Sequence, residues 1–183
     1  MKTHIKKIDH INLSLKESQD FIQRYHRHSK PLKRHMFSIG AVDELGDLMG
    51  VVTVDNCSSG GWSKQRSMKE IRRLCVSPDA APGTASFLMS KATNALFSMG
   101  IKAVISYTKP HESGSSLMGA GFNIYKRAKM KYKNGSVEGG LITWFKKYEQ
   151  DPDLDYYRSE TKDILTSTHN TIQEWEGQDE DIH

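Results

Sequence analysis

The sequence has little cysteine and no long apolar run. It contains two cysteines in 183 residues, Cys57 and Cys75, which is too few for a disulfide framework, so we expect reduced thiols in a cytoplasmic compartment. No apolar stretch approaches the roughly 20 residues of a membrane-spanning helix. The basic N-terminus, Met1–Lys7, is not followed by the apolar segment of a signal peptide. These absences argue against a secreted or membrane protein and predict one cytoplasmic domain with its own core.

Acidic residues are scarce in the first 150 residues and concentrated in the remainder. Residues 1–150 contain 24 Lys and Arg against 12 Asp and Glu, a net charge of +12, whereas residues 151–183 contain 2 against 10, a net charge of −8. A basic body favours a polyanionic partner, nucleic acid first, although basic proteins that bind no nucleic acid are common. We therefore expect a folded body, residues 1–150, and an acidic C-terminal extension, residues 151–183, that is partly helical by its apolar spacing.

The stretch from Glu70 to Phe87 organises the rest of the chain. It begins as an apolar, β-branched strand that stops at Ser77-Pro78-Asp79, because proline cannot continue a ladder. Gly83 allows the backbone to turn and to approach a ligand closely, and Thr84 is expected to cap the helix that follows. Backbone N–H groups at such a helix N-terminus hold phosphates in many proteins, although any strand-to-helix turn has the same outline.

Hydrophobic periodicity predicts the other elements. Ser14 and Glu17 form a capping-box pattern ahead of a helix over Leu15–Arg27. A basic segment, Asn123–Lys133, alternates in the manner of an edge strand. The other expected strands are residues 3–13, Met36–Val42, Leu48–Asp55, Ile101–Thr108 and Gly140–Lys147, with a short helix inside Glu112–Phe122.

The order of strand, glycine loop, long helix, strand and short helix ending in Gly-x-Gly-Phe resembles the core of the GNAT N-acetyltransferase superfamily. The resemblance covers Leu15–Lys147. It implies an α/β (α+β) fold, with a twisted, splayed mixed sheet flanked by helices on both faces. Residues 1–150 would then be a GNAT-like catalytic domain, and the cofactor would be acetyl-CoA or a related acyl donor.

The donor loop of the superfamily reads Gln/Arg-x-x-Gly-x-Gly/Ala, which corresponds here to Ala80–Ala85. Gly83 and Ala85 match, whereas Ala80 stands where the family has Gln or Arg. The family also places a tyrosine, its general acid, where this chain has Met118. The donor-binding residues that the resemblance implies are Cys75, Val76, Gly83, Thr84, Ala85 and Ser86.

A narrower set of motifs is similar to phage-encoded GNAT-like proteins of the Mom group of DNA modification proteins. The resemblance implies modification of the exocyclic amine of adenine in DNA, an anti-restriction function carried out in the cytoplasm of the bacterial host. Two alternatives stay open: acetyl transfer to a protein or small-molecule amine, and a non-catalytic nucleic-acid-binding protein. The motifs are His26-Arg27-His28-x-x-Pro31, Phe37–Gly40, Arg73-Leu-Cys-Val, Ala85–Leu88, Tyr107-Thr and Glu112-Ser-Gly.

Four of the candidate catalytic residues carry groups that can move a proton or bind the acceptor. An imidazole ordinarily titrates near neutral pH, so His26 and His28 are candidates for moving a proton, although the same residues suit a solvated helix end. Tyr107 ends a strand, where its phenol could donate a proton to a leaving thiolate, bond the acceptor or simply pack. Ser113 could replace the missing tyrosine. We expect no metal, since the two histidines lack an acidic or thiolate neighbour in the sequence.

Two adjacent arginines lie on the central strand. Strand alternation predicts that Arg72 and Arg73 point to opposite faces, with Glu70 and Arg72 sharing one face. A buried arginine is either ion-paired or binds an anion. We assign the functional role to Arg73, a candidate catalytic residue, because it matches the Arg-Leu of the resemblance.

Basic and aromatic side chains gather in two segments, one after the first helix and one before the central strand. An aromatic ring among cations suits stacking on a base and contact with phosphates, although an ordinary loop has the same composition. The oligomeric state, a homodimer included, is left open. The candidate nucleic-acid contacts are Arg27, Lys30, Lys33, Arg34, Trp62, Lys64 and Arg66.

Overall fold

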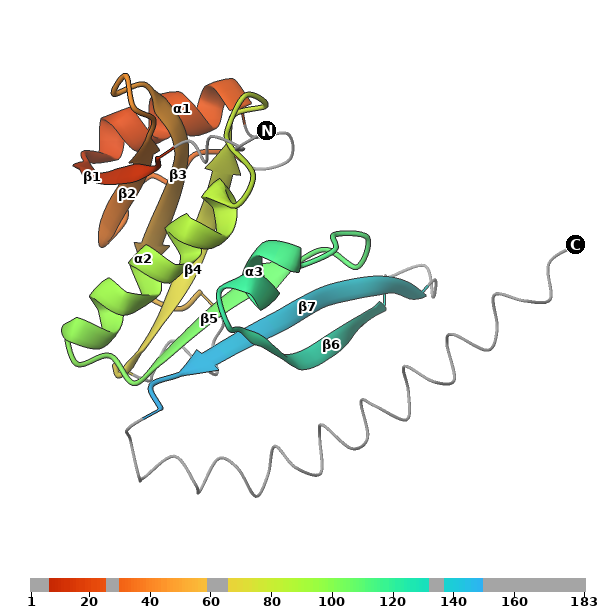
Figure 1. Cartoon of the computed structure of the whole chain (residues 1–183). Coiled ribbons are helices and arrows are strands. Elements are labelled where there is room, and N and C mark those ends of the chain that lie inside the picture. The colour runs from red at the N-terminus through yellow and green to blue at the C-terminus, as the bar shows by residue number, and fades with distance from the viewer. Residues whose placement is uncertain (1–6, 26–29, 59–65, 132–136, 150–183) are drawn as a thin grey trace, which may run out of the picture.

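The computed structural model describes residues 7–25, 30–58, 66–131 and 137–149. The candidates His26, Arg27, His28, Trp62 and Lys64 lie outside these residues, as does the acidic extension. The elements are β1 (Asp9–Leu13), α1 (Leu15–Tyr25), β2 (Phe37–Val42), β3 (Leu48–Asp55), β4 (Met68–Val76), α2 (Thr84–Ser98), β5 (Ala103–Thr108), α3 (Ser115–Gly119), β6 (Asn123–Lys131) and β7 (Val137–Lys147) (Figure 1).

The strands form one mixed sheet in the order β1-β2-β3-β4-β5-β7-β6. All described neighbours are antiparallel except β4 and β5, which run parallel because α2 connects them. The basic strand β6 lies at one edge, as its alternation predicts. The mixed α/β class is therefore confirmed.

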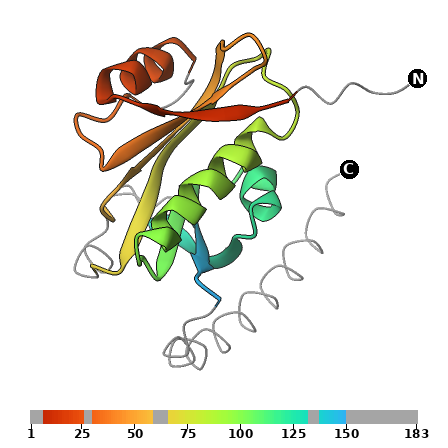
Figure 2. The same cartoon turned by 60° about the vertical axis from the view of Figure 1, so that its left-hand side comes forward.

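Helices cover both faces of this sheet (Figure 2). Adjacent residues of β3 show the arrangement, because Val51 packs in the group that contains Ile22 of α1 and Val52 packs in the group that contains Leu88 and Leu96 of α2. We call these the α1 face and the α2 face. Replacing a fully buried leucine of this kind by alanine typically costs about 2–5 kcal/mol, so α2 is a principal source of stability.

The sheet opens between β4 and β5. Their ladder runs from Met68↔Ala103 to Ile71↔Ser106. Beyond it, β5 continues only with β7, and β4 continues only with β3, within the described part of the chain. Figure 1 shows the two strands diverging from that point. The splayed sheet predicted from the resemblance is confirmed, and residues 72–76 of β4 border the opening.

The start of α1 follows its sequence signal. The Ser14 N–H donates to Glu17 Oε2 at 2.8 Å, and the Glu17 N–H donates to Ser14 Oγ at 3.3 Å. The capping box is therefore formed. Among the described residues no helix is both long enough and apolar enough to cross a membrane.

Candidate active site

The N-terminus of α2 faces solvent beside the opening of the sheet. Gly83 is its N-cap, with a left-handed φ of +87°, and its carbonyl accepts the first helical hydrogen bond from the Phe87 N–H at 2.9 Å. Ala85 and Ser86 therefore occupy the second and third helical positions, whose N–H groups have no acceptor within the helix. These two donors sit at the positive end of the helix dipole, a suitable place for a phosphate.

Thr84 does not cap the helix, contrary to the expectation. It is the first helical residue, it is buried, and its hydroxyl donates to the Ala81 carbonyl at 2.6 Å. In this loop the backbone at the cap is left-handed, a conformation that glycine adopts at low cost, and Gly83 occupies that position. Thr84 consequently stabilises the loop from inside and does not present its hydroxyl to a ligand.

The Cys75 thiol lies on the α1 face of the sheet, away from an acyl donor bound at the N-terminus of α2. The side chain packs on the α1 face in the group that contains Leu13, Phe21 and Val51. Burial raises the pKa of the Cys75 thiol to about 11. A contact between Cys75 and a donor would therefore be limited to backbone atoms.

The remaining donor-loop residues lie together on the α2 face. The Val76 side chain is partly exposed and shares with Leu88 the space beside Gly50. Ser86 lies next to α3, since a Cβ built on Gly119 would be 3.3 Å from the Ser86 Cβ. Val76 thus lies beside α2 and Ser86 beside α3, and the donor-binding role of Val76, Gly83, Ala85 and Ser86 stays a prediction.

The residues after β5 have separate local roles. Ser113 Oγ lies 3.1 Å from Ser115 Oγ and accepts from the Ser115 N–H at 3.4 Å, so it stabilises the first turn of α3. Tyr107 is half-buried on the α1 face, beside the group that contains Cys57 and Met68. Met118, at the position of the family's tyrosine, is 56% exposed. Tyr107 and Ser113 are therefore not brought together on one face.

A β-bulge corrects the expectation for the two arginines. Thr53 of β3 pairs with Arg73 and the next residue, Val54, pairs with Ile71, so Arg72 has no partner in β3. An extra residue of this kind breaks the alternation of side chains. Arg72 contacts Glu70, and Arg73 stands opposite Thr53. Both arginines therefore lie on the α1 face, beside the opening of the sheet.

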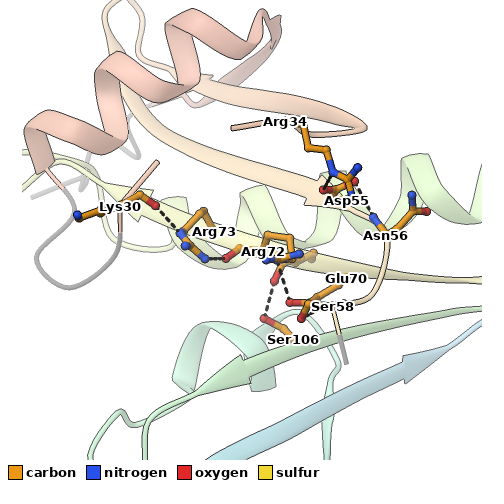
Figure 3. A network of polar contacts seen from close by, with 10 residues as sticks. Lys30, Arg34, Asp55, Asn56, Ser58, Glu70, Arg72, Arg73 and Ser106 are labelled. Atoms are coloured by element: carbon orange, nitrogen blue, oxygen red, sulfur yellow. Dashed lines mark hydrogen bonds and ion pairs between the residues drawn. The ribbon is translucent and has the colours of Figure 1, made fainter. Parts of the chain in front are cut away.

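Arg72 is ion-paired, as the shared face with Glu70 predicts (Figure 3). Arg72 Nε lies 3.2 Å from Glu70 Oε1, and Glu70 Oε2 accepts from the N–H of Ser58 at 2.7 Å and from its hydroxyl at 2.8 Å. The Glu70 side chain is 5% exposed. A buried carboxylate requires such compensation, so the arrangement indicates a structural role for Glu70.

Replacing Glu70 by glutamine is expected to lower the free energy of unfolding by about 2–3 kcal/mol. Glutamine keeps the volume and one acceptor oxygen, but it leaves the half-buried Arg72 without its counter-charge, a loss that partial exposure moderates. Urea denaturation measures the effect. The double variant Glu70→Gln/Arg72→Met should recover most of it, and unchanged stability of the single variant would contradict the structural role.

Arg73 differs from Arg72 in having no carboxylate partner among the described residues. Its Nε donates to the Lys30 carbonyl at 3.2 Å and its Nη1 to the Arg72 carbonyl at 2.7 Å. Desolvation by burial, and then the positive charge of Arg72, lower the pKa of Arg73, while Glu70 acts in the opposite direction. Of the two roles expected for a buried arginine, ion pairing and anion binding, Arg73 therefore fits anion binding. It stays a predicted site residue.

The described basic candidates fall into two groups. Lys30, Lys33 and Arg34 are exposed and precede β2, and the Lys30 carbonyl connects this segment to Arg73. Arg34 Nε lies 3.8 Å from Asp55 Oδ2. Arg66 is exposed ahead of Met68, at the opposite end of β4. The structure therefore brings only the first group near Arg73.

Sequence reasoning missed Thr53. Its Oγ1 is the one buried side-chain polar atom of the described residues without a hydrogen-bond partner. The alternation of β3 places Thr53 on a buried face, but no pattern in a single sequence shows which residue of β4 stands opposite it.

No protein-family model matches the sequence, and no curated protein matches it. Solved structures do match the fold. An IAA acetyltransferase from Bacillus cereus shares 15% identity at a TM-score of 0.56, covering 78% of this chain and 100% of its own. A Bacillus subtilis acetyltransferase solved in complex with CoA shares 14% identity at a TM-score of 0.55, covering 78% and 99%. A protein of the GNAT family from Desulfovibrio desulfuricans shares 11% identity at a TM-score of 0.60, covering 77% and 99%.

The structure is a splayed mixed sheet with a helix N-terminus beside its opening. The matches identify this architecture as the fold of the GNAT acetyltransferases, which confirms the predicted fold class. Because the identities are 11–15%, the likeness establishes the fold.

Proposed function

We propose that the protein is an N-acyltransferase that moves an acetyl group from acetyl-CoA to a primary amine. One observation carries the proposal: the sheet opens beyond Ile71↔Ser106, directly beside the glycine-capped N-terminus of α2. Backbone groups of β4 beyond Ile71 have no ladder partner on that side within the described chain, so they can pair with the amides of a pantetheine arm. Solved proteins of this fold include one in complex with CoA and one in complex with acetyl-CoA.

The residues present fit this donor. The N–H groups of Ala85 and Ser86 would bind its pyrophosphate, Gly83 keeps that approach free of a side chain, and β4 would hold the arm. When bound, acetyl-CoA supplies an activated thioester carbonyl. The departure at Ala80 removes a side-chain donor, so we assign pyrophosphate binding mainly to backbone groups.

The acyl group would pass directly to the amine. A nucleophilic cysteine needs a thiolate, but burial, aided by Glu70 at Cys57, raises the pKa of Cys57 and of Cys75 to about 11. The chain's contribution is therefore to position both substrates and to move a proton. We assign proton donation to the leaving thiolate to Tyr107, whose phenol stands near the end of β5.

For the acceptor we propose the exocyclic amine of a DNA base, in the manner of the Mom group. Support comes from the net charge of +12 over residues 1–150 and from the exposed Lys30, Lys33 and Arg34 beside Arg73. Binding that weakens steeply with salt would accompany such a substrate. Acetylation of a protein or small-molecule amine is the alternative that uses the same donor site.

The test begins with the donor and continues with the acceptor. Titration calorimetry with acetyl-CoA should show saturable binding to the purified protein, and absence of binding would overturn the transferase. DNA from cells that express the protein is then digested to nucleosides and weighed by mass spectrometry. A new mass on deoxyadenosine supports the DNA acceptor, whereas unmodified DNA together with acetyl-CoA binding assigns the enzyme to another amine.

A further inference from the structure

Arg73 carries unused hydrogen-bond donors. A guanidinium has five N–H groups, and two of them are engaged, by the carbonyls of Lys30 and Arg72. The other three, on Nη1 and Nη2, have no acceptor among the described residues. Both engaged acceptors are uncharged, so they fix the direction of the Arg73 side chain without neutralising its charge.

Two neighbouring arginines have acidic partners, whereas Arg73 has no carboxylate partner among the described residues. Glu70 neutralises Arg72 at 3.2 Å, and Asp55 faces Arg34 at 3.8 Å (Figure 3). Arg73 is half-buried, and desolvation is the main cause of its lowered pKa. A desolvated cation without a counter-charge is costly, so an arriving anion would gain more free energy here than at an exposed lysine.

Thr53 supplies a second, independent observation. It stands directly opposite Arg73 in the ladder and is 1% exposed, and its Oγ1 has no hydrogen-bond partner. A buried hydroxyl without a partner costs about 1–3 kcal/mol. Within the described chain, the ladder thus pairs this buried hydroxyl with the residue that carries the half-buried cation.

We propose that Arg73 and Thr53 form a subsite for a singly charged oxyanion, a carboxylate or a phosphodiester, carried by the acceptor substrate. The free N–H groups belong to the end of a planar fork, which binds two oxygens of such a group at once. The Thr53 hydroxyl provides a third donor. The subsite deepens the proposed function and rests on it in placing the acceptor on the α1 face.

The position of the subsite suits an acceptor. Arg73 lies two residues beyond Ile71, the last residue of β4 that pairs with β5. A substrate anchored there by its anion would extend toward the opening of the sheet, where the thioester of the donor is proposed to lie. The anion would then fix the orientation of the amine.

The test is an NMR titration of the arginine Nε–Hε signals in ¹⁵N-labelled protein, at constant ionic strength. Dimethyl phosphate represents a nucleic-acid backbone and propionate represents an amino acid or peptide acid. The Arg73 signal, assigned by its absence in Arg73→Gln, should shift and saturate with one of the two, and the stronger probe identifies the source of the anion. Thr53→Val should weaken that binding severalfold without lowering the melting temperature, because it removes an unsatisfied hydroxyl.

Lys16→Gln is the matched control, since it removes one positive charge from the solvent-exposed side of α1, where Lys16 pairs with Asp20. Arg73→Gln should lower the affinity at least about tenfold and Lys16→Gln should leave it unchanged. Arg73→Lys, which keeps the charge, substitutes if Arg73→Gln fails to fold. Equal losses in the Arg73 and Lys16 variants, or no saturable shift with either probe, would overturn the subsite.

Acetyl-CoA affinity, measured on the same samples, separates this inference from the proposed function. Protein that binds acetyl-CoA but shows no specific anion effect refutes the subsite alone. Protein that binds the anion through Arg73 but not acetyl-CoA keeps the subsite and refutes the transferase.

Discussion

Replacing Gly83 by valine is expected to lower the affinity for acetyl-CoA about 100-fold, equivalent to about 2.7 kcal/mol. Gly83 has a φ of +87°, and a Cβ built on it would have no heavy atom within 4 Å. The added Cβ therefore meets no protein atom, and the cost to the fold is the strain of the left-handed backbone. Its methyl groups project from the exposed side of the loop, where the pyrophosphate is proposed to bind, and its strain turns the loop away from the left-handed cap. Titration calorimetry measures the change.

Gly46→Val is the matched control. Gly46 lies in the β2–β3 hairpin with a φ of +85°, and its Cβ would likewise meet nothing within 4 Å. Both substitutions carry a similar conformational cost of roughly 1–2 kcal/mol, but only the one at Gly83 should affect the donor. An unchanged affinity in Gly83→Val, or an equal loss in Gly46→Val, would refute the donor loop.

Replacing Gly114 by alanine is expected to lower the free energy of unfolding by about 3 kcal/mol or more. Gly114 has a φ of +64°, and its Cβ would overlap the indole of Trp144, with Cη2 at 2.6 Å. That ring cannot move freely, because Trp144 is 2% exposed and its Nε1 donates to Thr108 Oγ1 at 2.8 Å. Thermal and urea denaturation measure the loss, which corresponds to roughly 10 °C in melting temperature for a chain of this length.

Gly121→Ala separates the overlap from the backbone strain. Gly121 has a φ of +79°, but its Cβ would meet only the end of the Lys146 side chain, at 3.3 Å. The Lys146 Nζ donates to the Ala120 carbonyl at 2.6 Å, but this contact of 3.3 Å needs a shift of only a few tenths of an ångström, so the cost should be close to the strain of roughly 1–2 kcal/mol. Equal losses of stability at Gly114 and Gly121 would show that the Trp144 ring moves aside at little cost. That result would contradict tight packing of β7 against the start of α3.

The sequence by itself determined the local structure. Ser14 and Glu17 form their capping box, and the hydrophobic pattern of residues 48–55 predicts β3 with the bounds that the structure has. The order of elements around Gly83 was sufficient to predict the fold. These features depend on hydrogen bonds and periodicities within short segments, which a sequence displays directly.

Only the tertiary structure decided how the site is composed. The bulge that places Arg72 and Arg73 on one face arises because the register between β3 and β4 shifts between Thr53 and Val54. No residue of β4 predicts this shift. The unsatisfied hydroxyl of Thr53 and the inward thiol of Cys75 likewise follow from pairing between distant strands. Register between strands is set by packing across the whole sheet, which is why periodicity within β4 predicted the wrong face for one arginine.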